Sequence, residues 1–198
     1  MIERQELRRQ TLHAATVFIP LLYLYFPDIG PLRGTQWVMI LFLVFGGLFV
    51  LGDYFRRRNA RVRRWFMWVI SPFIRDIESD KLTGASTIAI SFFLILLIFP
   101  GRIAVPACML LSVADSASGI TGRWIGKHPW HKDYTVEGTA AFIVSGLLLF
   151  LIGFPYIAPW KAVLVVVICA IFEALLERLN DNIVIPAAAA AMLLMLEV

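Results

Sequence analysis

Long apolar runs alternate with short polar segments along the chain. Several runs reach the roughly 17–25 residues that a membrane-spanning helix needs. Proline, glycine and charged residues separate the runs and indicate where each helix ends. The pattern predicts about seven spans, at residues 11–27, 35–54, 84–99, 103–121, 138–154, 160–177 and 183–197.

The segment 62–75 has a different pattern. It is too short to cross a bilayer comfortably, carries arginine at both ends and holds three aromatic residues before a proline. These features are typical of a helix that lies in the membrane interface. We therefore expect an all-α fold, a polytopic transmembrane helical bundle with one short interfacial helix, forming a single domain over residues 1–198.

Composition agrees with the membrane class. Hydrophobic residues make up 60% of the chain and charged residues 16%, against about 45–50% and 25% in soluble domains. The net charge of +4 does not indicate nucleic-acid binding, because the basic residues sit in short segments between helices. Cys108 and Cys169 lie inside apolar runs, which predicts buried thiols. No cleavable signal peptide is expected, since the first ten residues are polar.

The distribution of basic residues predicts the orientation. With the N-terminus inside, all but three of the 18 Lys and Arg residues fall on the inner side, the exceptions being Arg33, Arg102 and Lys161. The positive-inside rule then places the N-terminus in the cytoplasm. We expect a multi-pass protein of the cell (inner) membrane, with its chemically rich segments on the cytoplasmic face.

Asp115 is the main candidate for chemistry, because it lies inside an apolar run. An ionisable group at the centre of a membrane costs about 2.5–3.5 kcal/mol by insertion scales. Such a group usually faces a partner, an ion or a cavity. A magnesium ligand or a base for a hydroxyl are the two roles we predict, and oxygen-rich surroundings favour Mg²⁺ over zinc.

The loop after Asp115 combines glycines with cations and leads through Thr135-x-Glu137-Gly138 into the next span. Backbone N–H groups of such a loop, together with Lys and Arg, are suited to hold phosphate. The candidate phosphate-binding residues are Gly119, Gly122, Arg123, Gly126, Lys127, Lys132, Thr135 and Gly138.

Two further segments carry candidates, each with a simpler alternative. Arg9 and His13 share one face of the first helix, where an arginine also anchors topology and a histidine also packs in a core. Glu78 and Lys81 precede Gly84, where a helix N-terminus is suited to receive an anion. The alternative there is a solvated polar loop.

Glu173, Glu177 and Asp181 recur every four residues and would form one acidic stripe if the helix continues. Pairing with the arginine runs is the alternative explanation. Glu173 lies deepest in the apolar run and is the strongest functional candidate of the three.

Five short motifs, in order along nearly the whole chain, resemble the dolichol kinase/phytol kinase family of CTP-dependent membrane lipid kinases. They are Arg8-Arg9-x-x-x-His13, Glu78-x-x-Lys81-Leu82-x-Gly84-Ala85, Ala114-Asp115-x-x-Ala117 running to Gly122 and Gly126-Lys127, Thr135-x-Glu137-Gly138, and Glu173 before Asp181-Asn182-x-x-x-Pro186. One position departs from the family, which has lysine where this chain has Tyr134. Lys132, two residues earlier, is the candidate substitute.

The resemblance implies transfer of the γ-phosphate of CTP to the terminal hydroxyl of a lipid alcohol. It implies that Mg²⁺ binds to a subset of Asp115, Glu137, Glu173 and Asp181. Asp115, Glu78 and Glu137 are the implied catalytic residues, with Glu78 or Asp115 orienting or deprotonating the hydroxyl. The implied cofactor-binding set adds Arg9, His13 and Lys81 to the loop residues named above.

Two other functions stay open at this point. A phosphatidate cytidylyltransferase has a similar motif order but would release pyrophosphate, and a small transporter or scaffold is the third class. Polyprenol, a phytol-like alcohol and diacylglycerol all remain candidate acceptors. The oligomeric state is open too, a homo-oligomer included.

Overall fold

The computed structural model describes residues 4–70, 82–132, 134–175 and 180–198. Within these ranges the chain is almost entirely helical, with one small antiparallel hairpin. The helices are α1 (Arg4–Ala15), α2 (Phe18–Tyr25), α3 (Gly34–Arg56), α4 (Ala60–Ile70), α5 (Gly84–Ile98), α6 (Gly101–Leu110), the π-helical η3 (Leu111–Asp115), α7 (Ser116–Trp124), α8 (Val136–Gly153), α9 (Pro159–Leu175) and α10 (Asp181–Met195). The hairpin pairs β1 (Pro129–His131) with β2 (Tyr134–Thr135).

The all-α membrane class is supported by the length, composition and exposure of these helices. Three of the described helical stretches, Gly34–Arg56, Gly101–Trp124 and Val136–Gly153, are long and apolar enough to cross a membrane. Their outward side chains include large hydrophobic residues such as Phe45 and Leu148, which are more than half exposed. A soluble monomer rarely exposes this much contiguous apolar surface. The full set of seven spans stays a prediction.

The first predicted span, 11–27, is broken into two helices. Pro20 has no N–H to donate to the carbonyl of Thr16, so the regular helix cannot continue through this point. The structure has α1 ending at Ala15 and α2 beginning at Phe18. The carbonyl of Thr16 accepts instead from the N–H of Ile19 at 3.0 Å, and its hydroxyl donates to the carbonyl of His13 at 2.6 Å. The break leaves His13 at the last turn of α1.

The continuous run α6–η3–α7 forms the centre of the bundle, while α3 lies at its edge. In the most apolar window of each helix, 72% of the residues of Gly101–Trp124 are buried, against 11% for Gly34–Arg56. The core around the central run draws on α5, α8, α9 and α10, as Phe92, Phe142, Cys169 and Leu193 show. Cys108 and Cys169 are both buried and free, as predicted.

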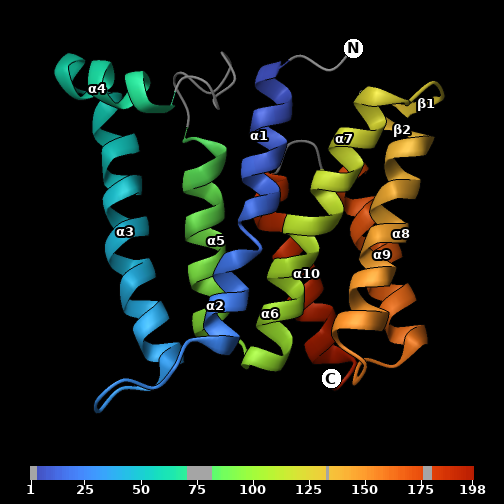
Figure 1. Ribbon diagram of the computed structural model, residues 1–198. Helices are drawn as coiled ribbons and strands as arrows, with labels where there is room; N and C mark the ends of the chain where they lie inside the picture. The colour runs from blue at the N-terminus through green and yellow to red at the C-terminus, as the bar shows by residue number, and fades with distance from the viewer. Residues whose placement is uncertain (1–3, 71–81, 133, 176–179) are drawn as a thin grey trace.

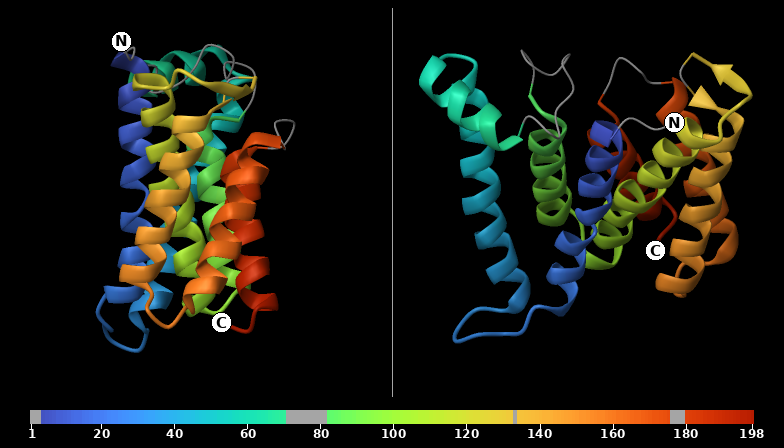
Figure 2. Two further views of the ribbon diagram at one scale, coloured as in Figure 1. Left: turned by 90° about the vertical axis from the view of Figure 1, so that its right-hand side faces the viewer. Right: turned by 45° about the horizontal axis from the view of Figure 1, so that its top comes forward.

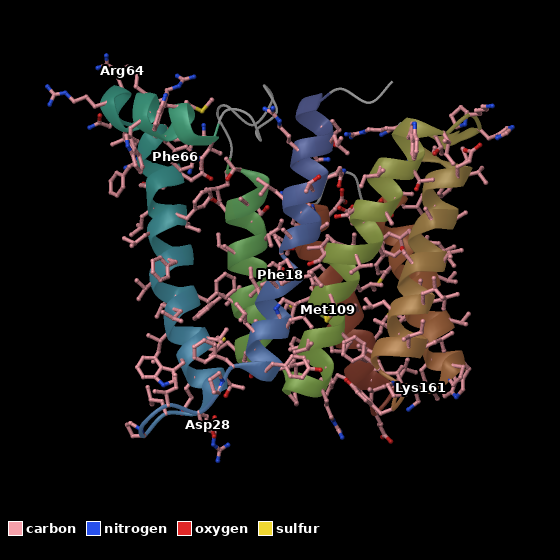
Figure 3. The ribbon with its side chains drawn as sticks, in the orientation of Figure 1. Phe18, Asp28, Arg64, Phe66, Met109 and Lys161 are labelled. Atoms are coloured by element: carbon pink, nitrogen blue, oxygen red, sulfur yellow. The ribbon has the colours of Figure 1, made fainter. Side chains whose placement is uncertain are left out.

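Most of the helices run up and down along one axis, and α4 lies across it, so the molecule has two ends (Figures 1 and 2). The N-terminus, α4 and the β1–β2 hairpin lie at one end and the C-terminus lies at the other (Figure 1). Arg64 of α4 marks the first end, and Asp28 and Lys161 mark the second (Figure 3). Helix α4 corresponds to the first part of the predicted interfacial helix, and its Trp65 and Trp68 are exposed.

Candidate functional site

Asp115 and His13 meet although they lie far apart in the sequence. Asp115 is the last residue of the π-helical segment η3, and π-helical turns are frequent at functional sites. Helix α1 packs across this segment and brings Nδ1 of His13 to 3.4 Å from Oδ2 of Asp115. His13 is buried, and the Asp115 side chain is 16% exposed. The two candidates thus form one pair inside the bundle.

Glu173 of α9 faces the same region from another side. It is buried, and its Oε1 accepts a hydrogen bond of 3.0 Å from the hydroxyl of Ser118, which lies one turn after Asp115. The negative charges of Asp115 and Asp181 both act on the Glu173 carboxyl. Two of the other predicted metal ligands, Asp115 and Asp181, therefore lie within electrostatic range of Glu173.

The acids fit Mg²⁺ bound jointly with a phosphate better than Mg²⁺ held by protein alone. Among the residues that the structure describes, no group of three or more His, Cys, Asp and Glu side chains forms a metal site. Mg²⁺ commonly uses one or two carboxylates and completes its shell with water and substrate phosphates. A cation bound beside the Asp115 and Glu173 carboxyl groups would favour the charged form of both.

The acidic stripe over 173–181 is wrong as a single helical face. Helix α9 is described as far as Leu175, and Asn180 has an extended backbone from which α10 begins at Asp181. The side chain of Asn180 caps α10 by accepting from the N–H of Asn182. A capping residue starts a new helix direction, so Asp181 reaches the site from α10. Glu177 lies outside the described residues.

Glu137, the fourth predicted metal ligand, has another partner. It lies in the first turn of α8, and its Oε1 is 2.6 Å from Nδ1 of the exposed His128. Its Oε2 also accepts from the backbone N–H of His128 at 3.3 Å. Glu137 thus closes the hairpin segment onto α8, and a role in catalysis or metal binding stays a prediction.

The glycines of the predicted phosphate loop lie where an added side chain would meet close neighbours. A Cβ on Gly138 would lie 3.2 Å from the Cα of Gly122, and a Cβ on Gly126 would lie 2.1 Å from the carbonyl of Gly122. Thr135 caps α8 by accepting from the N–H of Gly138 at 3.1 Å. Gly119 faces Gln10 of α1, whose side-chain nitrogen would lie 2.2 Å from an added Cβ. Close packing thus gives all four glycines a structural role, and their part in binding phosphate stays a prediction.

The predicted cations gather at the end of the molecule that carries the N-terminus. Arg9 and Arg123 both contact the carboxylate of Glu6, and Nη2 of Arg9 lies 2.6 Å from its Oε1. Lys127 follows α7 and is exposed. Lys132 lies at the turn of the hairpin with a φ of 42°, a left-handed conformation uncommon for lysine. Tyr134, at the family's lysine position, lies in β2.

Asp53 is a buried acid that sequence reasoning missed. It is fully buried at the end of α3 and binds Nε of Arg56, itself 1% exposed. Its other oxygen accepts from the N–H and hydroxyl of Thr83 and from the hydroxyl of Ser86. The N-terminus of α5, where we expected an external anion, thus receives this carboxylate. An ionisable residue at the end of an apolar run was the available signal.

Glu78 and Lys81 lie outside the described residues, so their predicted roles are not tested. The segment they precede is described from Leu82 onward. There, the side chain of Asn182 donates to the carbonyl of Gly84 at 3.3 Å and to Thr87 at 3.0 Å. These bonds join the starts of α5 and α10.

A cavity of about 410 Å³ lies between α1, α2, α3 and α5, next to the start of α10. Its size falls in the range of small-molecule sites, about 300–1,000 Å³. His13 forms part of its wall, so one residue borders both the cavity and Asp115. The polar lining residues are Arg9, His13, Thr16, Thr83 and Asn182.

Two curated proteins are similar to the chain over most of their length. One is an uncharacterized protein, RP860, of Rickettsia prowazekii, 24% identical over 190 residues that cover 91% of this chain and 89% of the relative. The other is CTP-dependent diacylglycerol kinase 1 of Schizosaccharomyces pombe, 28% identical over 208 residues that cover 96% of this chain and 93% of the relative. No family model matches the chain, and no solved structure matches it significantly.

The similarity to the yeast enzyme supports a general class, that of CTP-dependent lipid kinases, which are phosphotransferases acting on an alcohol group in lipid metabolism. The apolar helices support a membrane location. A closer assignment to dolichol or phytol kinases remains a resemblance of motifs.

Proposed function

We propose that the chain is a CTP-dependent kinase that phosphorylates the terminal hydroxyl of a membrane lipid alcohol. The observation that carries the proposal is the meeting of Asp115, His13 and Glu173 beside a cavity with polar and apolar walls. Phosphoryl transfer needs positioning and charge neutralisation more than covalent chemistry. Similarity to a named CTP-dependent diacylglycerol kinase supplies the donor and the reaction.

In the proposed reaction the lipid hydroxyl oxygen forms a bond to the γ-phosphorus of CTP. The bond from that phosphorus to the oxygen bridging to the β-phosphate breaks, and CDP leaves. The hydroxyl proton passes to Asp115 or Glu78, the two bases that the sequence offers. Arg123, Lys127 and Lys132 would hold the triphosphate at the end of the bundle where α7 and the hairpin lie.

Asp115 and Glu173 would hold Mg²⁺, with Asp181 nearby and Glu137 as a further candidate. When bound, the ion would neutralise charge on the phosphate oxygens. Ser118 contributes by orienting the Glu173 carboxylate through its hydrogen bond. Burial keeps these groups apart from bulk water, where their electrostatic effect would be weaker.

Diacylglycerol is the first acceptor to test, because the named relative is a diacylglycerol kinase. Polyprenol and phytol-like alcohols are the next acceptors to test, because the motifs resemble those of dolichol and phytol kinases. We also propose that the site faces the cytoplasm from the inner membrane, since the end with the N-terminus carries α4 and its arginines. Whether the chain forms a homo-oligomer is to be measured from its mass in detergent.

The test is product analysis with purified protein, Mg²⁺, each of the four ribonucleoside triphosphates labelled on the γ- or α-phosphate, and the three lipid alcohols. We expect label from γ-labelled CTP to appear in a lipid monophosphate, with CDP released. A parallel reaction contains phosphatidate in place of the alcohol, and release of pyrophosphate with label from α-labelled CTP in that lipid would instead identify a cytidylyltransferase. No transfer with any pair would reject the enzyme assignment.

A further inference from the structure

The cavity beside His13 has walls of two kinds. Arg9, Thr83 and Asn182 are polar and lie in α1 and at the starts of α5 and α10. These helices begin toward the end of the molecule that carries the N-terminus (Figure 1). The polar part of the cavity therefore lies toward that end, where the predicted phosphate-binding cations also gather.

The remaining wall is apolar and extends deeper into the bundle. Ile19 of α2, Phe42 and Phe49 of α3, and Ile88 of α5 line it. Helix α3 lies at the edge of the bundle and exposes apolar side chains on its outer face. The cavity is thus separated from the surrounding lipid by one peripheral helix. A molecule with a polar head and an apolar tail matches this arrangement.

His13 connects the polar part to the reaction site. Its side chain is 6% exposed, and within the described residues its Nε2 has no hydrogen-bond partner. Its Nδ1 faces Asp115. The carboxylate favours the tautomer with the proton on Nδ1, which leaves Nε2 as an acceptor. A buried acceptor without a donor is unfavourable, and a ligand hydroxyl that displaces the atoms now covering Nε2 would supply that donor.

We infer that this cavity binds the acceptor lipid, with its hydroxyl donating to Nε2 of His13. The first part of the hydrocarbon chain lies against α3 and α5, and the rest extends into the bilayer. This inference rests on the proposed kinase function, and it adds the location of the acceptor and the group that positions its hydroxyl. Phosphate transfer then takes place at the hydroxyl, on the Nε2 side of His13. Where Asp115 is the base, Nε2 takes the hydroxyl proton and Nδ1 passes its own proton to Asp115.

Two neighbouring glycines on α3 offer a matched test. Gly46 lines the cavity, and a Cβ there would lie 3.3 Å from the Phe42 ring and 3.7 Å from the Cβ of Ala89. Gly47 is not among the lining residues, and a Cβ there would meet nothing within 4 Å. Gly46→Leu therefore fills the cavity, while Gly47→Leu adds the same side chain to the same helix elsewhere.

Kinetics in mixed micelles separate lipid binding from nucleotide binding. Gly46→Leu should raise KM for diacylglycerol by about tenfold or more and leave KM for CTP within about twofold, because only acceptor binding is removed. Gly47→Leu should leave both constants within about twofold. An unchanged lipid KM in Gly46→Leu, with normal elution in size-exclusion chromatography, would overturn the inference.

A second measurement does not depend on activity or on a variant. Wild-type protein is irradiated with diacylglycerol carrying a diazirine near the start of one acyl chain. We expect adducts in the segments 42–49 and 85–89, removed by excess unlabelled diacylglycerol. Adducts confined to the outer face of α8 would contradict the inference.

The two measurements separate the possible failures. Expected adducts without kinase turnover would reject the proposed function and keep the lipid site. Turnover with adducts elsewhere would keep the function and reject the site.

Discussion

Asp115 occupies the position where the chemistry of the proposed site converges. It faces His13 across 3.4 Å and acts electrostatically on the Glu173 carboxyl. Asp115→Asn keeps the shape and removes the charge needed to bind a cation or take a proton. We expect kcat to fall by at least about 100-fold, measured as CDP release, with the protein still monodisperse in detergent. The control is Glu197→Gln at the far end of the chain, and full turnover in Asp115→Asn would refute the role.

Replacing Asp53 should lower the free energy of unfolding by more than replacing Arg56 does. Asp53→Ala removes the carboxylate that Nε of Arg56 binds and also the acceptor for Thr83 and Ser86. Breaking a buried ion pair costs about 3–5 kcal/mol. Arg56→Met leaves Asp53 with the donors of Thr83 and Ser86, so the loss should be smaller. Thermal unfolding in detergent measures both, and equal losses would contradict this account.

For single residues, the sequence indicated which residues are suited to chemistry but not which side chains contact one another. Asp115 stood out because a carboxylate in an apolar run is costly. The same reasoning applies to Asp53, which escaped notice because it precedes a run of arginines. The contact between His13 and Asp115 depends on how α1 crosses η3, and no local pattern encodes that crossing. Such pairs need the packed structure.

Gly126 follows α7 and lies against Gly122 and Thr135, and its substitution tests whether packing or phosphate binding explains this glycine. A Cβ there would overlap the carbonyl of Gly122 at 2.1 Å, so Gly126→Ala must shift backbone. We expect a loss of about 1–3 kcal/mol in stability. Gly153→Ala, whose Cβ would meet its nearest neighbour at 3.9 Å, is the control. A raised KM for CTP at unchanged thermal stability would favour the phosphate-binding role instead.

The sequence predicted helices better than the features that interrupt them. Apolar runs gave α3, α5, α8, α9 and α10 to within about three residues, because a helix of spanning length must be apolar throughout. The break before α2 follows from Pro20, whose missing N–H was visible in the sequence. The β1–β2 hairpin was not predicted, since strands of three and two residues carry no alternating pattern.

The molecule as a whole has a basic end and a far end, and its orientation in the membrane can be tested by cysteine labelling. Cys108 and Cys169 are buried, so an introduced cysteine should dominate the reaction with a membrane-impermeant maleimide.

Arg61→Cys lies on α4 at the basic end, and Ile29→Cys, whose native side chain is 51% exposed, lies between α2 and α3 at the far end. The positive-inside rule predicts that Ile29→Cys reacts in spheroplasts and that Arg61→Cys reacts only in inverted vesicles. The chain without introduced cysteines measures background in both preparations. The reverse pattern would place the proposed kinase site on the outer face, away from cytoplasmic CTP, and would count against both the orientation and the proposed donor.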